Sequence, residues 1–475
     1  PLPDTLSASL RPYQQAGYDW LSFLYDNRLG GVLADDMGLG KTVQALALVA
    51  RALSGAGRQE GGRPRFLVIA PTSVVPNWAA EAHRFLPSIR VAAVTETARK
   101  SGRTLDETVG DADLVITSYA LARLDADAYR GMAWSGLLLD EAQFVKNRTS
   151  ATYSRIRSLG VPFTLAITGT PLENSLMDLW SMLSLAAPGL FPSPTGFAEY
   201  YQRPIERDGD AERLAQLRRR VRPLMLRRTK EVVADELPPK LEQILEVELA
   251  PRQRAVYDRY LARERSRVLG LMGEFDKNRF AIFRALTILR QVALDAALVD
   301  PVHTGVPSAK LDLLDELLAD ALAEGHRVLV FSQFTRLLAR VRSRLDAADI
   351  GYAYLDGSTL RRGEVVDRFR SGEADVFLIS LKAGGFGLNL AEADYCVLLD
   401  PWWNPAVEAQ AVDRAHRIGQ TRSVFVYRLV AKDTIEEKVM ALKAAKAELF
   451  DAVMSDAEGV AGAGITADDV RELLG

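Results

Sequence analysis

The chain has very little cysteine and histidine. Cys396 is its only cysteine, and its four histidines, His83, His303, His326 and His416, are scattered along 475 residues. A single thiol excludes an internal disulfide framework and a cysteine-based zinc site. The spacing of the histidines does not suggest a metal cluster either. We therefore expect neither a disulfide-stabilised fold nor a zinc site.

The chain also lacks a dominant charge of one sign and a long apolar run. It has 59 basic and 62 acidic residues and a net charge of −3, so a nucleic-acid site would have to be a local basic groove. We find no run of about 18 apolar residues that would span a membrane and no signal-peptide pattern. Hydrophobic residues make up 48% of the chain, which argues against extensive disorder. Because the sequence begins with Pro1, we expect it to be a fragment of a longer protein.

Two stretches of the chain alternate short apolar runs with helical patterns, which favours an α/β fold with parallel sheets. We expect a first lobe over residues 1–172 and a second over 306–450, followed by a C-terminal tail at 451–475. Residues 173–305 show helical spacing without a clear strand, so we interpret them as helical insertions and a linker. The predicted strands are 31–34, 66–70, 114–117, 137–140, 164–168, 328–331, 352–355, 376–380, 396–400 and 424–430.

The segment Asp35-Asp36-Met37-Gly38-Leu39-Gly40-Lys41-Thr42 follows a predicted strand and opens a predicted helix. Glycines there let backbone N–H groups face a phosphate, and the helix N-terminus favours negative charge. In this interpretation Lys41 reaches the β- and γ-phosphates and Thr42 binds Mg²⁺. Asp35 departs from the strict phosphate-loop pattern, which has glycine at that position. The alternative is a glycine-rich turn that only caps a helix.

Asp140 and Glu141 end another apolar run. Acidic side chains at the end of a buried strand are costly unless they have partners or a chemical role. Asp140 would hold Mg²⁺, and Glu141 would orient or deprotonate an attacking water. The alternative is an acidic helix N-terminus.

Arg414 and Arg417 are three residues apart, which predicts that they share one helix face. Two guanidinium groups aimed at one point would stabilise charge on a γ-phosphate. Since the phosphate loop belongs to the first lobe, this pair would complete the site from the second lobe. Two solvated surface arginines are the alternative.

Four further stretches leave two interpretations open. Residues 168–171 could link the nucleotide site to a nucleic-acid groove or be a turn, and residues 382–389 could approach a phosphate or be a flexible loop. The tryptophan pair at 402–403 could stack on bases or pack internally. The basic run at 213–230 could follow a phosphate backbone or be a solvated helix with acidic partners.

In this order the motifs resemble those of the SWI/SNF-type family of superfamily 2 helicase-like ATPases. The matching stretches include LRPYQQAGYDWL, LADDMGLGKT, VIAPTSVVPNW, LLLDEAQFVKN, AITGTPLEN, LRRTKEVV and SLKAGGFGLNLAEADYCVLLDPWWNPAVEAQAVDRAHRIGQ. The resemblance implies two RecA-like lobes joined by family-specific helical insertions. It also implies ATP hydrolysis with Mg²⁺, coupled to movement along double-stranded DNA without strand separation.

The resemblance also implies roles for individual residues. Gln14 resembles the glutamine that recognises adenine, Gly38, Gly40, Lys41 and Thr42 the phosphate loop, and Asp140 and Glu141 the metal and water residues. Gly387 resembles a loop residue near the nucleotide, and Arg414 and Arg417 resemble arginine fingers. DNA-backbone contacts are expected at Thr72, Ser73, Thr117, Ser118, Gln333, Gly357, Ser358, Lys382 and Trp402.

The chain departs from the family pattern at Gln143, where many members have histidine. A neutral amide can still form hydrogen bonds across the lobes, so we expect coupling to persist. The compact helical middle and the DEAQ sequence are typical of bacterial members. We therefore expect a monomeric motor in the bacterial cytoplasm at the nucleoid (in the nucleus if the source is eukaryotic), acting on DNA-bound proteins other than nucleosomes.

Two other functions are compatible with the motifs. One is a strand-separating RNA or DNA helicase of the same superfamily, although we see no clear wedge hairpin or accessory unwinding domain in the sequence. The other is an ATP-gated DNA-binding scaffold without turnover. The complete set of Lys41, Asp140, Glu141, Arg414 and Arg417 disfavours the scaffold.

Overall fold

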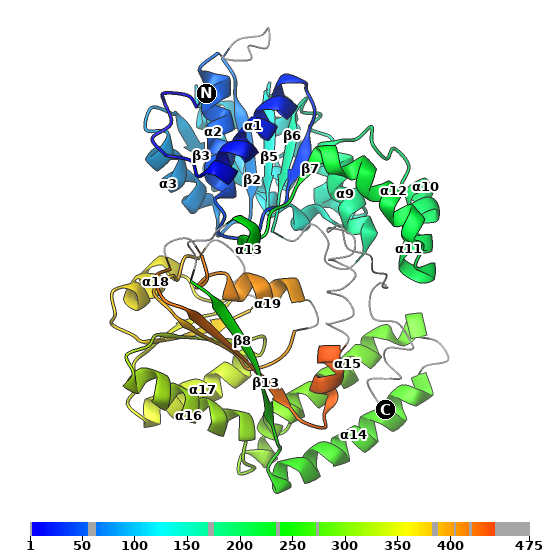
Figure 1. Ribbon diagram of the computed structural model, residues 1–475, viewed down its shortest axis with the longest axis vertical. Coiled ribbons are helices and arrows are strands. Elements are labelled where there is room, and N and C mark those ends of the chain that lie inside the picture. The colour runs from blue at the N-terminus through cyan, green and yellow to red at the C-terminus, as the bar shows by residue number, and fades with distance from the viewer. Residues whose placement is uncertain are drawn as a thin grey trace. The chain divides into compact units, whose positions relative to one another are not determined.

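The computed structural model describes residues 2–55, 63–169, 175–233, 238–271, 275–381, 388–402, 405–417 and 420–441. The chain forms two compact units that divide between residues 235 and 236. Each unit is built around one parallel sheet (Figure 1). The α/β class with two parallel sheets that the sequence predicts is therefore confirmed.

Unit 1 contains a seven-stranded sheet in the order β3-β4-β2-β5-β6-β1-β7, with every pair parallel. The central strands are apolar runs such as Phe-Leu-Val-Ile-Ala, and all five residues of β2 are buried. Burial on both faces is typical of a parallel sheet covered by helices on each side. The strands are β1 (Gly31–Leu33), β2 (Phe66–Ala70), β3 (Val91–Ala93), β4 (Leu114–Ser118), β5 (Gly136–Asp140), β6 (Thr164–Ile167) and β7 (Met225–Leu226).

Helices cover this sheet and extend beyond it into a helical subdomain. This helical subdomain packs around a cluster of aromatic rings in which Phe191 contacts both Phe197 and Tyr201. The helices are α1 (Pro12–Asp26), α2 (Lys41–Leu53), α3 (Val75–Phe85), α4 (Ala98–Ser101), α5 (Leu105–Val109), α6 (Tyr119–Leu124), α7 (Ala126–Arg130), η1 (Ala142–Val145), α8 (Ala151–Arg157), α9 (Leu176–Ala186), α10 (Pro194–Phe197), η2 (Ala198–Gln202), α11 (Arg203–Asp208), α12 (Ala211–Val221), η3 (Arg222–Leu224) and α13 (Lys230–Val233).

Unit 2 contains a six-stranded parallel sheet in the order β10-β11-β9-β12-β13-β8. Its strands are β8 (Lys240–Val247), β9 (Val328–Ser332), β10 (Tyr352–Leu355), β11 (Val376–Ser380), β12 (Tyr395–Leu398) and β13 (Val424–Ala431). Its helices are α14 (Pro251–Leu271), α15 (Phe275–Leu294), η5 (Ala296–Leu298), η6 (Pro301–His303), α16 (Ala309–Ala323), α17 (Thr335–Ala347), α18 (Arg362–Arg370) and α19 (Pro405–Val412).

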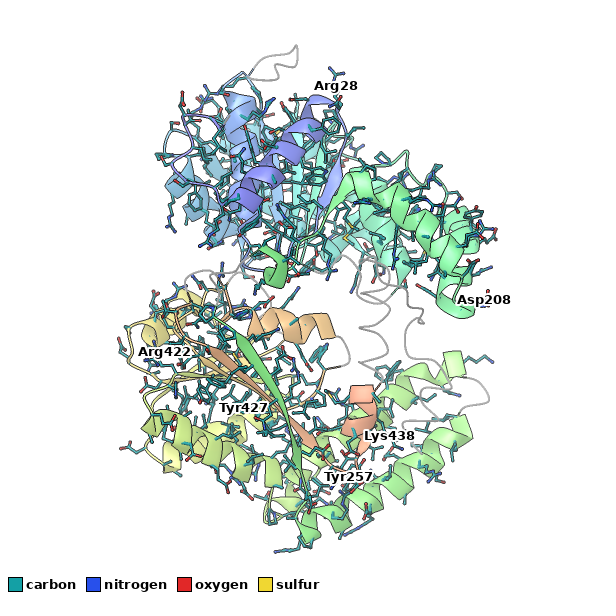
Figure 2. All side chains as sticks on the ribbon, viewed as in Figure 1. Arg28, Asp208, Tyr257, Arg422, Tyr427 and Lys438 are labelled. Carbon is teal, nitrogen blue, oxygen red and sulfur yellow. The ribbon has the colours of Figure 1, made fainter. Side chains whose placement is uncertain are left out.

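The long helices α14 and α15 pack together and onto the end of β13. The hydroxyl of Tyr257, on α14, accepts a hydrogen bond from the backbone N–H of Ile435 at 2.8 Å. Figure 2 shows Tyr257 close to Lys438, which lies in the same short helical segment as Ile435. Within the described part of the chain, the helices are too short or too polar to cross a membrane.

The middle of the chain is not entirely helical, contrary to the sequence prediction for residues 173–305. It contributes β7 to the first sheet, beside β1, and β8 to the second sheet, beside β13. β8 was missed because its sequence, Lys-Leu-Glu-Gln-Ile-Leu-Glu-Val, places charged residues among the apolar ones, and most of its side chains are exposed at the sheet edge. The division between the units therefore falls inside the segment predicted as one linker.

Candidate active site

The loop between β1 and α2 has the geometry of a phosphate loop. Gly38 and Gly40 have φ values of 87° and 77°, a left-handed conformation that glycine adopts without strain. Lys41 is the first residue of α2, and its Nζ donates hydrogen bonds to the carbonyl oxygens of Asp35 (2.6 Å) and Asp36 (3.1 Å). The Lys41 cation is thereby held by the loop backbone at a helix N-terminus, where backbone N–H groups and the helix dipole favour phosphate binding.

Helix α1 packs directly on this loop through Gln14. The Gln14 side chain is buried, accepts a hydrogen bond from the N–H of Arg11 at 2.9 Å, and donates one to the Leu39 carbonyl at 3.1 Å. The Tyr13 hydroxyl donates to the same carbonyl at 3.0 Å. A Cβ on Gly40 would lie 2.5 Å from Gln14 Nε2, so this contact requires glycine for space as well as for its backbone angle.

Asp140 is the last residue of β5, and its carboxylate is held by two donors. Trp78 Nε1 donates to Oδ2 at 2.7 Å, and the N–H of Glu141 donates to Oδ1 at 3.0 Å. Burial raises the pKa of Asp140 above its usual value, while the Trp78 hydrogen bond and the charge of Lys41 lower it. Burial and the two neighbouring carboxylates raise the pKa of Tyr119, which therefore stays neutral as it donates to the Asp140 carbonyl at 2.8 Å.

Glu141 is buried and adopts a left-handed backbone conformation, with φ 49° and ψ 55°. Such a conformation is strained for a residue with a Cβ and is typical of functional sites. Its Oε2 accepts a hydrogen bond from Gln143 Nε2 at 2.8 Å, and Gln143 Oε1 accepts one from the Thr168 hydroxyl at 2.8 Å. A chain of hydrogen bonds thus links the end of β5 to the end of β6 and orients the Glu141 carboxylate.

The phosphate loop and the acidic pair lie at the same edge of one sheet. β5, β6 and β1 are consecutive neighbours in parallel register, so their carboxyl ends meet. Crevices outside the carboxyl ends of parallel strands are where open α/β sheets bind ligands. The structure therefore brings Gln14, Lys41, Asp140 and Glu141 to this edge of unit 1.

The predicted DNA contacts of unit 1 differ from one another in accessibility. Thr72 and Ser73 are exposed in the turn after β2. Thr117 is fully buried and its hydroxyl donates to the Val94 carbonyl at 3.3 Å. Ser118 is also buried and caps α6 by accepting the N–H of Leu121 at 3.3 Å. Only the first pair presents its side chains to solvent in this structure.

The predicted DNA contacts of unit 2 follow the carboxyl ends of β10, β9 and β12. Gly357 and Ser358 are exposed. Gln333 is half-buried, and its Oε1 accepts a hydrogen bond from the buried Arg290 at 3.4 Å. Trp402 packs partly into the core, and its N–H donates to Glu408 at 2.6 Å. Lys382 and Gly387 lie outside the described residues.

The two candidate arginine fingers do not share a helix face, so this sequence prediction is wrong. α19 ends at Val412, and the following residues form turns and bends. Arg414 is buried, and its carbonyl accepts the N–H of Leu390 at 3.0 Å. Arg417 is half-buried, with Nη1 3.5 Å from the Leu388 carbonyl. The spacing of three would suit a continuing helix, but the N–H groups of Arg414 and Ala415 bond to carbonyls only three residues back, at Ala411 (3.4 Å) and Val412 (3.0 Å), which is the pattern of a turn.

Comparison with known proteins identifies the family. The SNF2-related domain matches residues 13–298, and the helicase conserved C-terminal domain matches residues 309–419. The chain belongs to the SNF2-related family.

Relatives of this SNF2-related chain include bacterial and eukaryotic proteins. The putative ATP-dependent helicase/translocase YwqA of Bacillus subtilis is 37% identical over 95% of this chain and 49% of its own length. The ISWI chromatin-remodeling complex ATPase ISW2 of Saccharomyces cerevisiae is 34% identical over 98% of this chain and 43% of its own length. A solved structure of the Sulfolobus solfataricus SWI2/SNF2 ATPase core with dsDNA is 31% identical, covers 96% of this chain and 95% of that chain, and has a TM-score of 0.48. The chain spans about half the length of the curated relatives it matches, or less.

The side chains of this SNF2-related site suit Mg²⁺. Asp140 supplies carboxylate oxygens, and Thr42, half-buried at the second position of α2, supplies a hydroxyl. Mg²⁺ is held by few protein oxygens because phosphates and water complete its coordination. The described residues contain no cluster of three or more His, Cys, Asp or Glu side chains that could hold a metal ion.

Sequence reasoning missed two partners of the acidic pair. Trp78 lies in the quoted stretch VIAPTSVVPNW, but nothing local in the sequence indicates that its indole reaches Asp140, 62 residues away. Gln143 was expected to act across the lobes, whereas its described hydrogen bonds, to Glu141 and Thr168, lie within unit 1. The one available signal is position: Trp78 lies in the first turn of the helix that follows β2, close to the carboxyl edge of the sheet where Asp140 ends β5.

The Trp78→Phe substitution should move the acid limb of the pH–activity profile to higher pH. The indole N–H stabilises the ionised form of Asp140, so its loss raises the pKa of that carboxyl further and protonates it at a higher pH. A hydrogen bond to a charged group is worth about 1.5–3 kcal/mol, which corresponds to a shift of about one to two pH units. The measurement is steady-state turnover between weakly acidic and neutral pH.

Trp134→Phe is the matched control for this experiment. Trp134 is also buried in unit 1, and its indole N–H donates to the Tyr129 carbonyl at 2.7 Å, away from the acidic pair. Its profile should coincide with that of the wild type. Equal shifts in both variants would contradict a specific role for Trp78.

Proposed function

We propose that this chain is the motor of an ATP-dependent double-stranded DNA translocase that displaces or repositions DNA-bound proteins without separating the strands. The observation that carries the proposal is the meeting of a phosphate loop and an acidic pair at adjacent carboxyl ends of one parallel sheet. A lysine at a helix N-terminus and an acidic pair at the same sheet edge are parts that phosphoryl transfer requires.

Each residue has a distinct task in the proposed hydrolysis. Lys41 binds the β- and γ-phosphates, and Gln14 recognises adenine. Glu141, held by Gln143, orients the attacking water and accepts its proton. Thr42 and Asp140 would hold Mg²⁺, which neutralises phosphate charge when bound. Arg414 and Arg417 of unit 2 would stabilise charge on the γ-phosphate.

Double-stranded DNA as the track is supported by the relatives and by the exposed residues at the sheet edges. One relative is named a helicase/translocase and another a chromatin-remodeling ATPase. Thr72 and Ser73 in unit 1, and Gly357 and Ser358 in unit 2, are small, exposed residues after the carboxyl ends of strands. Hydroxyl and backbone N–H groups of this kind bind phosphates without reading sequence, so movement should be independent of sequence and sensitive to salt.

Steady-state ATPase activity with different nucleic acids tests the proposal. Turnover is measured without nucleic acid and with duplex DNA, single-stranded DNA and RNA in parallel. Glu141→Gln serves as the inactive control, because an amide cannot accept a proton from water. We expect stimulation by duplex DNA of about tenfold or more, since phosphate contacts drive binding, and displacement of a triplex strand from duplex DNA.

Other results would redirect the assignment. Preferential stimulation by single strands or RNA, together with unwinding of a duplex, would favour a strand-separating helicase. Binding of ATP and DNA without turnover would favour the gated scaffold. An ATP turnover rate that is the same without nucleic acid and with each nucleic acid tested would contradict the translocase proposal for this chain.

A further inference from the structure

The backbone that follows β7 runs beside the start of the phosphate loop. The N–H of Ala34 donates to the Leu226 carbonyl at 2.7 Å, and the N–H of Asp36 donates to the Arg228 carbonyl at 3.0 Å. The N–H of Lys230 then donates to the Asp36 carboxylate at 3.1 Å. Backbone hydrogen bonds between the two segments thus continue beyond the ends of β1 and β7. They connect the stretch LRRTKEVV to the loop that would hold the phosphates.

The Arg228 side chain makes a forked pair with Asp35. Nε donates to Oδ1 at 2.9 Å and Nη2 to Oδ2 at 2.5 Å. Asp35 is fully buried and the Arg228 side chain is 12% exposed. Asp35 is the residue that departs from the strict phosphate-loop pattern, and this pairing accounts for the departure: the position holds a carboxylate because a buried guanidinium faces it.

The same guanidinium reaches two helices. Nη2 donates to Gln44 Oε1 on α2 at 2.8 Å, and Nη1 donates to the Tyr13 carbonyl on α1. Tyr13 precedes Gln14, whose amide is hydrogen-bonded to the loop at Leu39. Arg228 therefore connects the phosphate loop, α2 and the segment that carries the candidate adenine-binding residue.

Gly17 shows how closely α1 approaches this group. A Cβ at Gly17 would lie 1.9 Å from Gln44 Oε1 and 2.7 Å from Arg228 Nη2. Only glycine leaves room for the guanidinium and the amide at this point of the helix. Any side chain at position 17 would push the network apart without removing one of its charges.

We propose that Arg228 is a positioning residue of the nucleotide site, which holds Tyr13 and Gln14 against the phosphate loop and so sets the affinity for ATP and its selection over GTP. This inference rests on the proposed function of Gln14 in adenine recognition. A planar guanidinium makes the forked pair and the bonds to Gln44 and Tyr13 at once, whereas an ammonium cannot match that geometry. If the forked pair with Asp35 is lost, the segment that carries Tyr13 and Gln14 can shift, while Lys41 and the acidic pair stay in place.

Arg228→Lys tests the inference while keeping a buried positive charge for Asp35. We expect the KM for ATP to rise about tenfold, kcat to stay within about threefold, and the ratio of kcat/KM for ATP over GTP to fall about tenfold. Gly17→Ala should change the same ratio in the same direction with every charge retained. A residue that only stabilised the fold would not change selection between two nucleotides.

Arg90→Lys is the matched control. Arg90 donates two hydrogen bonds to the buried carboxylate of Asp113 at the amino-terminal edge of the same sheet, away from the loop. Its KM and its ATP/GTP ratio should equal those of the wild type. Gln14→Ala is run in parallel and should lower the ratio at least as much as Arg228→Lys.

Three results would overturn the inference. They are an unchanged ATP/GTP ratio in Arg228→Lys, an equal fall in Arg90→Lys, and an unchanged ratio in Gln14→Ala, because Arg228 is argued to act through Gln14. Calorimetric titration with ATP and GTP reads the same selectivity without turnover. A chain that binds ATP selectively but does not hydrolyse it would contradict the proposed function alone.

Discussion

Replacing Lys41 by alanine should reduce ATP turnover at least about 10²-fold, the typical cost of removing one donor that stabilises developing charge. In the structure its Nζ lies inside the phosphate loop, on the carbonyls of Asp35 and Asp36. Alanine preserves helix propensity at the start of α2, so the loop backbone should persist. ATP binding measured by calorimetry and turnover measured at saturating DNA should both fall.

Arg51→Ala provides the control for a lost cation on the same helix. Arg51 is in the last turn of α2 and pairs with Asp26 at 2.7 Å. Surface pairs of this kind contribute little to stability, and this one is remote from the loop, so turnover should stay at the wild-type level. Near-normal turnover in Lys41→Ala would remove the phosphate-loop assignment.

Replacing Arg417 by alanine should cut turnover about 10³-fold, the lower end of the effect of an arginine finger in phosphoryl transfer. DNA binding and ATP binding should stay close to wild type, because the finger is argued to act on the transition state. Arg417 belongs to unit 2 and Lys41 to unit 1. A loss of turnover with intact binding would therefore support the finger assignment.

Arg422→Ala is the corresponding control, and Figure 2 labels this residue. Arg422 donates to the Asp394 carboxylate at 3.0 Å, and its side chain is 59% exposed. Its loss should leave turnover unchanged. Full turnover in Arg417→Ala, measured on protein with wild-type thermal unfolding, would contradict the finger assignment.

Strands that are continuous apolar runs could be predicted from the sequence with accurate ends. The predictions for Phe66–Ala70, Tyr352–Leu355 and Val376–Ser380 match the structure residue for residue. The reason is that β2 and β11 are buried on both faces, so their whole length is apolar. β8 lies at a sheet edge with charged side chains in solvent, and it pairs with β13, which begins at Val424. Such a strand carries no local signal of its pairing.

The arginine motif shows a different limit of sequence reasoning. A spacing of three predicts a shared helix face only if the helix continues, and α19 ends at Val412. The burial of Arg414 and the partial exposure of Arg417 follow from the turns that come after it. Where a helix ends depends on which carbonyls find other donors, and the side-chain pattern does not report that.

The sequence by itself determined the chemical groups of the candidate site and the strands that carry them. Lys41 and Glu141 follow recognisable strands and Asp140 ends one, and carboxyl ends of parallel strands meet at one edge whatever the order of the strands. Only the tertiary structure decided how these groups are held. Trp78 reaches Asp140 across 62 residues, and Arg228 reaches Asp35 across 193. Such pairs depend on sheet order and helix packing, because a hydrogen bond needs its two atoms within about 3 Å, and no local pattern in the chain encodes that distance.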